Sequence, residues 1–425
     1  MSRPEAPADG VTGAKERPLR LAVQGVLAEG VGSGAGSFPL LLAALLEAGH
    51  TVEFFGNPNY IKLPSLARFP HFRYHELHVA SVEAAYRAFE RVPTQYPGAV
   101  LAQIAHVAYA RAAAERIERA NAATPYDVVL TTDLHALWPC RVPLLSWPQS
   151  PPQTELSALR DPVTERLVRA SWGAPRYAAV RAFYAYKALL ARATLPFTDA
   201  YLCSTRWARD EWVRFGADPA NVRLLPYALD LAAFHAAPDR APGAPTLLWL
   251  GRAAPRKRLD LFLEAFRLLR ARHPALRARL VGNLRGDPFA ASLLAAHAGT
   301  PGLSVEEPVP RDRVPALLAE VDVLVQPSQH ENFGFSVAEA LAAGRPVVAG
   351  PTNGTLEYAG PAGFEFAAYT PGAVADATAR ALAAVHERGP ALSERAREAA
   401  RQFDRATVAR RFCTIARELA ARPRA

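Results

Sequence analysis

The stretch from Val321 to Glu357, VDVLVQPSQHENFGFSVAEALAAGRPVVAGPTNGTLE, decides the fold. It predicts an apolar strand over 321–325, a helix over 337–343 and a second apolar strand over 346–349. A strand, a helix and a strand in this order form a βαβ unit, and open α/β sheets bind ligands beyond the carboxyl ends of their strands. The sequence therefore places a binding site in the polar and aromatic loop over 326–335.

Two carboxylates lie at this loop and at the helix that follows it. Ser336 and Glu339 have the spacing of a capping box, so a helix cap is the simplest interpretation of Glu339. Glu331 lies eight residues earlier, in the loop. Gly334 allows a close backbone approach, and the free N–H groups from Phe333 to Ser336 favour an anion, as does the helix dipole. A carboxylate beside an anion site suggests a ligand that carries both hydroxyl groups and phosphates.

The same residues resemble the signature of a known family. Glu331, seven intervening residues that include Asn332-Phe333-Gly334-Phe335, and then Glu339 resemble the E-x7-E motif of the family four glycosyltransferases, which are retaining enzymes that use nucleotide sugars. The resemblance implies the GT-B fold, an α/β architecture of two Rossmann-like domains whose parallel sheets face a central cleft. It also implies that Glu331 contacts the donor sugar, that the intervening amides face the sugar and the diphosphate, and that Glu339 binds the ribose.

A cluster of cations follows the predicted strand over 246–250. Gly251 and Arg252 end this strand, and Lys257 comes five residues later. Cations at a strand end can clamp a diphosphate, and each charge-assisted hydrogen bond contributes about 1.5–3 kcal/mol. The G-R-x4-K pattern resembles the family's diphosphate-binding pair, which implies that Arg252 and Lys257 act with Glu331 in catalysis.

A further predicted strand over 279–281 ends at Gly282 and Asn283, where the resemblance implies a nucleobase site formed largely by backbone groups. The chain contains no Asp-x-Asp, and no His, Cys or carboxylate cluster has the spacing of metal ligands. We therefore expect no metal ion and no cofactor other than the nucleotide-diphosphate sugar, which serves as co-substrate. Arg252, Lys257 and the helix N-terminus would stabilise the departing diphosphate.

The N-terminal half resembles the start of a Rossmann domain. A strand over 20–23, a glycine-rich loop, a helix from about Phe38 and a strand over 51–55 follow one another. The loop contains Gly32 and Gly34, which by resemblance face the acceptor side of the cleft. The alternative is that these glycines only shape a turn.

Two further acceptor-side candidates follow the apolar runs over 127–130 and 142–145, which predict buried strands. His135 follows the first run, and Gln149 follows the second. Many members of the family carry a histidine near the donor sugar just after the second of these strands, where this chain has Gln149 or a neighbour. His135 could take over that role, and a structural role is its alternative.

Two other functions remain open at this point. A nucleotide-sugar-binding protein without turnover is favoured by the missing histidine. An NAD-dependent oxidoreductase is favoured by the glycine loop and by Glu53, which lies near the position that reads a ribose. The glycines are spaced G-x-G-x-G, however, and not as the G-x-G-x-x-G of dinucleotide-binding proteins.

At 425 residues the chain is long enough for two domains. We expect a disordered tail over 1–17, an acceptor domain over 18–234, a linker over 235–245, a donor domain over 246–400 and a C-terminal helix over 401–425 that packs back across the cleft. No apolar run approaches the roughly 20 residues of a membrane span. Three scattered cysteines without metal or redox spacing indicate the cytoplasm.

The net charge of +9 indicates an acidic partner. No stretch resembles a known nucleic-acid reader, so we expect no nucleic acid. The segment over 160–192 interleaves basic and aromatic residues, which also allows peripheral docking on the inner face of an anionic membrane, where a glycan or lipid-linked acceptor would be reached. The alternative is a solvated pair of surface helices.

Overall fold

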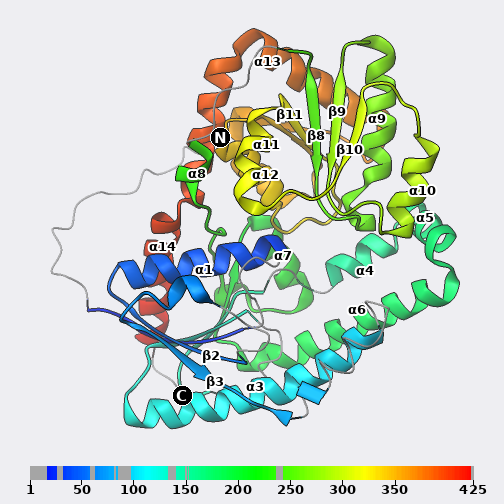
Figure 1. Ribbon diagram of the computed structural model, residues 1–425. Coiled ribbons are helices and arrows are strands. Elements are labelled where there is room, and N and C mark those ends of the chain that lie inside the picture. Colours follow the sequence, from blue (N-terminus) through cyan, green and yellow to red (C-terminus); the bar gives the residue numbers. More distant parts are fainter. Residues whose placement is uncertain are drawn as a thin grey trace.

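The computed structural model describes residues 17–25, 32–57, 63–80, 83–84, 97–132, 140–148, 151, 153–235 and 243–422. The described strands form two sheets, and all their pairings are parallel. Figure 1 shows the sheets in two layered units, with the C-terminal unit above the N-terminal one. Most of the predicted tail and residues 236–242 of the predicted linker lie outside the described residues.

The described strands of the N-terminal sheet have the order β3-β2-β1-β4-β5-β6-β7. They are β1 (Arg20–Gln24), β2 (Thr51–Gly56), β3 (Phe72–Glu76), β4 (Val128–Thr131), β5 (Leu144–Ser146), β6 (Ala200–Cys203) and β7 (Val222–Leu224). The central strand β1 is buried almost throughout, as expected for a parallel strand that is covered on both faces. The order 3-2-1-4-5 is that of a Rossmann sheet.

Helices connect these strands and cover the sheet. They are α1 (Gly32–Glu47), α3 (Pro97–Ala123), α4 (Gln153–Leu159), α5 (Pro162–Trp172), α6 (Ala174–Thr194), α7 (Arg206–Phe215) and α8 (Leu231–His235), with short 3-10 turns at η1 (Pro64–Leu66), η2 (Leu195–Phe197) and η3 (Pro219–Asn221). The sequence signals for α7 are clear. Thr205 accepts a hydrogen bond from the Ala208 N–H at 3.0 Å, and Gly216 ends the helix with a left-handed φ of 117°.

The described strands of the C-terminal sheet repeat the same pattern, with the order β10-β9-β8-β11-β12-β13. They are β8 (Thr246–Leu250), β9 (Arg277–Val281), β10 (Leu303–Glu306), β11 (Val323–Gln326), β12 (Val347–Ala349) and β13 (Gly363–Glu365). The helices are α9 (Leu259–Arg272), α10 (Pro288–Ala296), α11 (Val314–Ala319), α12 (Phe335–Ala342), α13 (Pro371–Ala400) and α14 (Arg405–Ala420). Short 3-10 turns lie at η4 (Pro255–Lys257), η5 (Arg311–Arg313), η6 (Gly354–Tyr358), η7 (Gly360–Ala362) and η8 (Arg401–Phe403).

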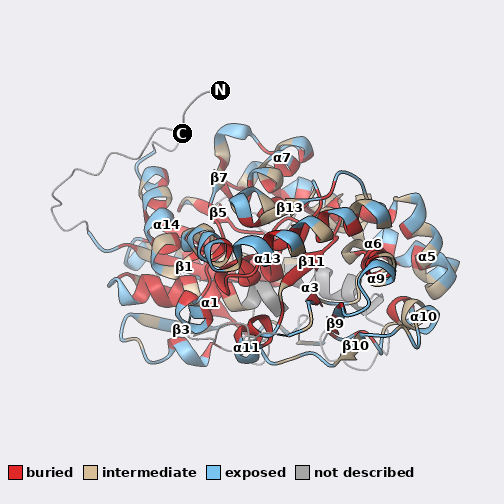
Figure 2. Ribbon diagram, turned by 90° about the horizontal axis from the view of Figure 1, so that it is seen from above, coloured by how far each residue is buried: buried red, intermediate tan, exposed pale blue. Residues whose placement is uncertain are grey.

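The signature region has the predicted βαβ form, with β11, α12 and β12 in sequence. All of α12 is buried, because one side packs on the sheet and the other meets the N-terminal unit. Figure 2 shows buried residues concentrated at the sheets and on the inner faces of the surrounding helices. The signature helix therefore lies in the interior and not on the surface.

The last helix, α14, leaves the C-terminal unit and packs on α1. Arg405 forms an ion pair with Glu47 of α1 at 2.9 Å, and the Leu229 N–H donates to the Phe403 carbonyl at 2.7 Å. The chain end thus ties the two units together at the side of the molecule where α1 and α14 run (Figure 1).

The beginning of α1 differs from the prediction. The helix begins at Gly32 and not at about Phe38, so Gly32 and Gly34 belong to the helix and do not form a loop. Poor helix propensity argued for a loop, but tertiary packing overrides that preference. Gly36 approaches Arg311 of the C-terminal unit so closely that a Cβ atom there would collide with the guanidinium group. A side chain at position 36 would therefore require the Arg311 side chain to move.

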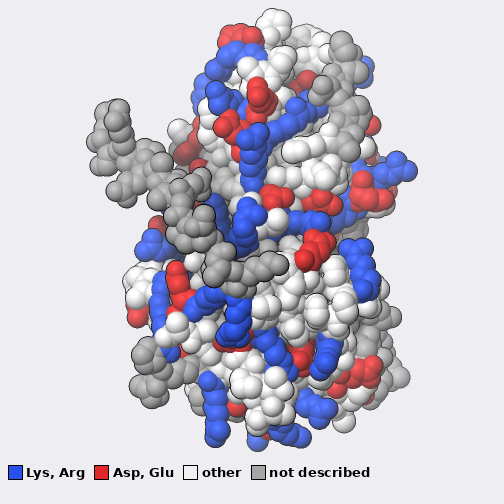
Figure 3. Space-filling view, turned by 90° about the vertical axis from the view of Figure 1, so that its left-hand side faces the viewer, with Lys and Arg blue, Asp and Glu red and all other residues white. Residues whose placement is uncertain are grey.

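Among the described residues, no helix is both long enough and apolar enough to cross a membrane. On the face shown in Figure 3, basic side chains are spread over both units and interspersed with acidic ones. That face therefore carries mixed charge and no single basic patch.

Candidate active site

A cavity of about 360 Å³ lies where the two units meet. It is lined by the carboxyl ends of β8 and β9, by the loop after β11 and by the start of α12, with Tyr227 contributed by the N-terminal unit. The three residues predicted to be catalytic, Arg252, Lys257 and Glu331, all line it. So do the predicted donor-side residues Gly251, Gly282, Asn283, Asn332, Phe333, Phe335, Ser336 and Glu339.

Glu331 is held by two cations. Its side chain is 6% exposed, and its Oε2 atom accepts hydrogen bonds from the Arg256 guanidinium at 2.8 Å and from the Lys257 ammonium. Burial alone would raise the pKa of Glu331, but the charges of Arg256 and Lys257 outweigh burial and lower the pKa to about 2. Glu331 is therefore a carboxylate at every physiological pH.

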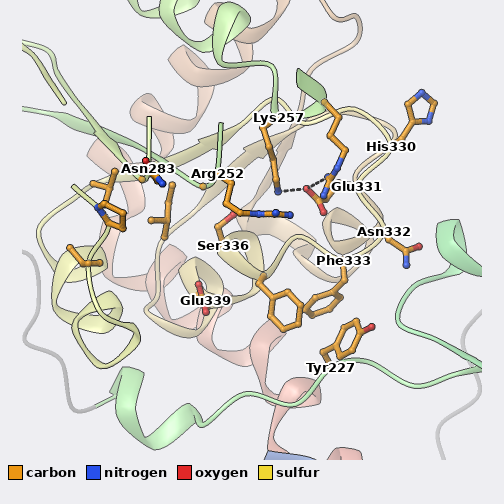
Figure 4. Close-up of a pocket in the computed structure, with 18 residues that line it drawn as sticks. Tyr227, Arg252, Lys257, Asn283, His330, Glu331, Asn332, Phe333, Ser336 and Glu339 are labelled. Carbon is orange, nitrogen blue, oxygen red and sulfur yellow. Dashed lines mark hydrogen bonds and ion pairs between the residues drawn. The ribbon is translucent and has the colours of Figure 1, made fainter. Parts of the chain in front are cut away.

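Arg252 and Lys257 extend into the cavity toward Glu331 (Figure 4). Lys257 lies at the end of η4, and burial lowers its pKa despite the opposing charge of Glu331. A weakly solvated ammonium bound to one carboxylate can exchange that partner for a phosphate. These two cations are thus placed to receive a diphosphate.

Glu339 lies on the other side of the cavity, on α12 (Figure 4). It is 7% exposed, and among the described residues its carboxylate accepts no hydrogen bond. The Arg311 guanidinium lies 3.9 Å away, which is too far for one. Burial raises the pKa of Glu339 to about 7, although the charge of Arg311 opposes this shift. A buried carboxyl group without a donor is suited to bind a ligand's hydroxyl groups.

The capping-box interpretation of Ser336 and Glu339 was wrong. The helix begins at Phe335, and the residue in the N-cap position is Gly334, which has extended backbone and no capping side chain. The spacing S-x-x-E is therefore shifted by two residues from a cap, which leaves Glu339 free for the cavity. Gly334 does not line the cavity, and its N–H donates to the Thr355 hydroxyl at 2.8 Å.

Aromatic rings pack against one another at the loop between β11 and α12. Phe333 and Phe335 lie at 4.9 Å between ring centroids, and each contacts Tyr227, at 5.3 and 5.0 Å. Tyr227 stacks in turn on Trp147, which follows β5, at 4.7 Å. The Phe-Gly-Phe turn of the signature thus packs on the N-terminal unit, which fixes the position of Glu331 relative to both sheets.

Hydrogen bonds between the units hold the same loop. The Thr205 hydroxyl donates to the Asn332 carbonyl at 2.9 Å, and Glu357 accepts a bond from the Arg206 N–H at 3.0 Å. The hydroxyl of Tyr358 donates to the Ser204 carbonyl at 2.8 Å. The start of α7 is therefore fixed against the residues that follow the signature.

The structure describes two of the four predicted acceptor-side residues. His135 and Gln149 lie outside the described residues, and Gly32 and Gly34 lie in α1. Sequence reasoning missed Arg256 and Tyr227 as lining residues. Arg256 was visible as a neighbour of Lys257 in a basic run, but the resemblance assigned roles only to Arg252 and Lys257.

Residues 244–384 match the family model described as glycosyl transferases group 1. This match covers most of the C-terminal unit. Among curated proteins, D-inositol 3-phosphate glycosyltransferase 2 of Catenulispora acidiphila is 34% identical over 208 residues, which cover 44% of this chain and 49% of the relative. The chain thus spans about half the length of this relative in the match.

Solved glycosyltransferase structures match nearly the whole chain. Sucrose-phosphate synthase from Thermosynechococcus elongatus matches with a TM-score of 0.67 and 19% identity over 95% of this chain and 99% of that chain. The Anabaena protein Alr3699/HepE, solved with UDP-glucose, matches with a TM-score of 0.61 and 15% identity over 93% of this chain and 99% of that chain. The fold of this chain is therefore GT-B, as predicted.

Proposed function

We propose that the protein is a retaining glycosyltransferase, which moves a sugar from a nucleotide-diphosphate sugar to a hydroxyl group of a glycan or lipid-linked acceptor. The observation that carries this proposal is the ionised Glu331 beside Lys257 and Arg252 in the cavity between the units. Cations and a carboxylate in one buried site suit a ligand that carries both a diphosphate and sugar hydroxyl groups.

In this proposal each charged group has a separate task. Arg252, Lys257 and the N-terminus of α12 stabilise the negative charge that develops on the diphosphate as it leaves. Glu331 accepts hydrogen bonds from the sugar hydroxyls, and Glu339 accepts them from the ribose. Within the described ranges, no three His, Cys, Asp or Glu side chains come together as metal ligands, and these cations supply the positive charge.

The reaction balances without another group. The acceptor oxygen bonds to the anomeric carbon on the face from which the diphosphate leaves, the bond from that carbon to the diphosphate oxygen breaks, and this oxygen takes the acceptor's proton. Retention of the anomeric configuration follows from the resemblance to the family. The products are the glycosylated acceptor and a nucleoside diphosphate.

The test is the release of nucleoside diphosphate from UDP-, GDP- and ADP-sugars, with water, glycans, lipid-linked sugars and inositol phosphates as acceptors. The curated relatives' name is the reason to include inositol phosphates. We expect slow hydrolysis of one donor class, and faster release with the right acceptor. Donor binding without any release over the whole panel would favour the nucleotide-sugar-binding protein instead.

The geometry does not favour an NAD-dependent oxidoreductase. Glu53 is 2% exposed and is bonded to the Arg20 guanidinium at 2.6 Å, to His75 Nε2 at 2.7 Å and to the Tyr126 hydroxyl at 2.8 Å. These bonds outweigh burial and lower the pKa of Glu53. Because its oxygens are already engaged, Glu53 is not available to bind a ribose.

The raised pKa of Glu339 predicts a pH dependence of donor binding. If the ribose hydroxyls donate to the carboxylate, the donor binds only the ionised form, whose share grows as the pH rises through about 7. We expect the donor Kd to be about tenfold weaker at pH 6 than at pH 8 by proton linkage. The Kd can be measured by calorimetry across this range, with Glu339→Gln as the variant that should show a flat profile.

The same group makes an opposite contribution to the stability of the free protein. The pKa of Glu339 is about 7 in the folded state and 4.5 by its ordinary value. Its contribution to stability is therefore complete below pH 4.5 and is lost as the pH rises through 7.

A donor Kd that does not change between pH 6 and pH 8 would contradict the assignment of Glu339 to the ribose.

We also propose that α5 and α6 dock on an anionic membrane, which would bring a lipid-linked acceptor to the cleft. Arg181, Leu189 and Arg192 share one face of α6, and Leu189 is 72% exposed. An exposed apolar side chain between arginines suits the headgroup region of an anionic bilayer.

Membrane docking predicts co-sedimentation with vesicles of phosphatidylglycerol and phosphatidylcholine, but not with phosphatidylcholine alone. Replacing Arg181 and Arg192 with glutamate should reduce the bound fraction several-fold, because each basic residue contributes about 1 kcal/mol near such a surface. The charge-matched control is Arg395→Glu with Arg410→Glu, on α13 and α14. Equal binding by the two double variants would show that α6 is not the docking surface.

A further inference from the structure

Arg256 lies between two glutamates that come from different units. Its Nε atom donates to Glu155 on α4 at 2.7 Å, and its Nη1 atom donates to Glu331 at 2.8 Å. The arginine side chain is 14% exposed, and that of Glu155 is 25% exposed. The bridge is therefore mostly removed from solvent. In such a buried place charged hydrogen bonds are strong, and the loss of one partner is costly.

Helix α4 is held against the donor side of the cleft by both units. The Gln153 side chain donates to the Glu211 carbonyl of α7 at 3.0 Å, which anchors α4 to the N-terminal unit. On the other side α4 contacts η4, the turn that carries Arg256 and Lys257. Glu155 is thus presented to Arg256 by a helix whose position depends on how the units fit together.

The helices that follow strengthen this placement. Phe289 of α10, in the C-terminal unit, packs into an apolar cluster with Leu159, Val168, Tyr177 and Val180 of the α4–α6 segment. Asp161 caps α5 and lies 3.8 Å from the buried Arg258 guanidinium. The α4–α6 segment therefore contacts the C-terminal unit through an apolar cluster and through two ion pairs, Glu155 with Arg256 and Asp161 with Arg258.

The bridge bears on donor binding because Glu331 shares its cations with the ligand. In the free protein the Glu331 carboxylate has two partners, Lys257 and Arg256. In the proposed function Lys257 turns to the diphosphate, so Arg256 becomes the remaining cation at Glu331. Without a second anchor, Arg256 would also be drawn toward the two negative charges of the diphosphate.

We propose that Glu155 is a positioning residue, which anchors Arg256 on Glu331 while Lys257 moves to the donor's diphosphate. Glu155 itself touches neither the donor nor the reacting atoms and acts through Arg256. Through Glu155, the packing of the α4–α6 segment on the C-terminal unit affects the orientation of the Glu331 carboxylate, which holds the sugar in the proposed function. This inference rests on the proposed function.

The test is Glu155→Gln, which keeps the size of the side chain and one acceptor oxygen but removes the charge. We expect kcat for donor turnover to fall about tenfold, which is less than the loss that a misplaced reacting group can cause. KM for the donor should change less than twofold, because Arg252 and Lys257 remain in place. Glu155→Asp, which keeps the charge, should recover part of kcat.

The matched control is Glu165→Gln on α5, because Glu165 also pairs with an arginine, Arg169, at 3.1 Å, but does so at the surface. It should leave both constants and the melting temperature unchanged. Equal kcat for Glu155→Gln and Glu165→Gln would overturn the inference. A fall in kcat with an equal rise in KM and a lower melting temperature would show only a structural role, and would overturn it too.

A second readout does not need turnover. With carboxyl-13C glutamate and a saturating nucleoside diphosphate, Glu331 should stay ionised down to pH 4 in the wild type and in Glu165→Gln, but should begin to titrate above pH 4 in Glu155→Gln. An unshifted Glu331 titration would overturn the inference. A wild type without turnover on any donor would refute the proposed function separately, and this titration would still decide the role of Glu155.

Discussion

Replacing Glu331 with glutamine is expected to lower the rate of sugar transfer by about a hundredfold to a thousandfold, the effect typical of removing one well-placed polar group from an active site. Glu331 is 6% exposed and is bonded to both Arg256 and Lys257. A water molecule therefore could not take the place of its carboxylate and hold the donor sugar in the same orientation. The measurement is kcat and KM for the donor, with the loss expected in kcat.

Glutamine is the right substitution because the two cations need a partner. Glu331→Ala would leave the buried Lys257 ammonium without its carboxylate and Arg256 with Glu155 alone, and breaking a buried ion pair costs about 3–5 kcal/mol of stability. A low rate for the alanine variant would therefore mix loss of fold with loss of function. Full transfer activity of a folded Glu331→Gln variant would show that the sugar-binding carboxylate has been assigned wrongly.

The acid stability of the protein gives an independent check on Glu331. Its pKa is about 2 in the folded state and 4.5 by its ordinary value, so its stabilising contribution is present above pH 4.5 and is lost as the pH falls toward 2. Glu331→Gln should therefore lose less stability than the wild type over this range.

Replacing Lys257 with methionine is expected to weaken donor binding by about ten- to a hundredfold, because a charge-assisted hydrogen bond contributes about 1.5–3 kcal/mol. Methionine fills a similar volume without the charge, and Arg256 remains as a partner for Glu331. Calorimetric titration of the donor measures the effect.

The control for Lys257 is Arg267→Met, which removes one positive charge from the exposed surface of α9. It should leave the donor Kd unchanged within twofold, because exposed ion pairs contribute little. Equal donor affinity in Lys257→Met and the wild type would remove Lys257 from the diphosphate site.

Much of the fold is predictable because parallel strands buried on both faces are continuous apolar runs. Residues 323–326 and 347–349 form the strands expected on either side of the signature helix, and β8 has the bounds 246–250 that its apolar run predicts. Boundaries at glycines are less predictable. The helix α1 begins at Gly32 and not at about Phe38, although its first turn is rich in glycine.

The candidate site is predictable only where its members are close in sequence. Arg252, Lys257, Glu331 and Glu339 belong to two local motifs, and the structure brings both motifs to one cavity. The partner of Arg256 could not be foreseen, because Glu155 is 101 residues away and is placed by the packing of α4 on η4.

The central claim is that the cavity binds a nucleotide sugar, and a thermal-shift panel tests it most directly, since a ligand that binds only the native state raises the melting temperature. UDP-, GDP- and ADP-sugars and NAD(H) are compared on the wild type and on Lys257→Met. The account predicts a rise with one class of nucleotide sugar that is reduced in the variant. A rise with NAD(H) alone, equal in both proteins, would contradict it.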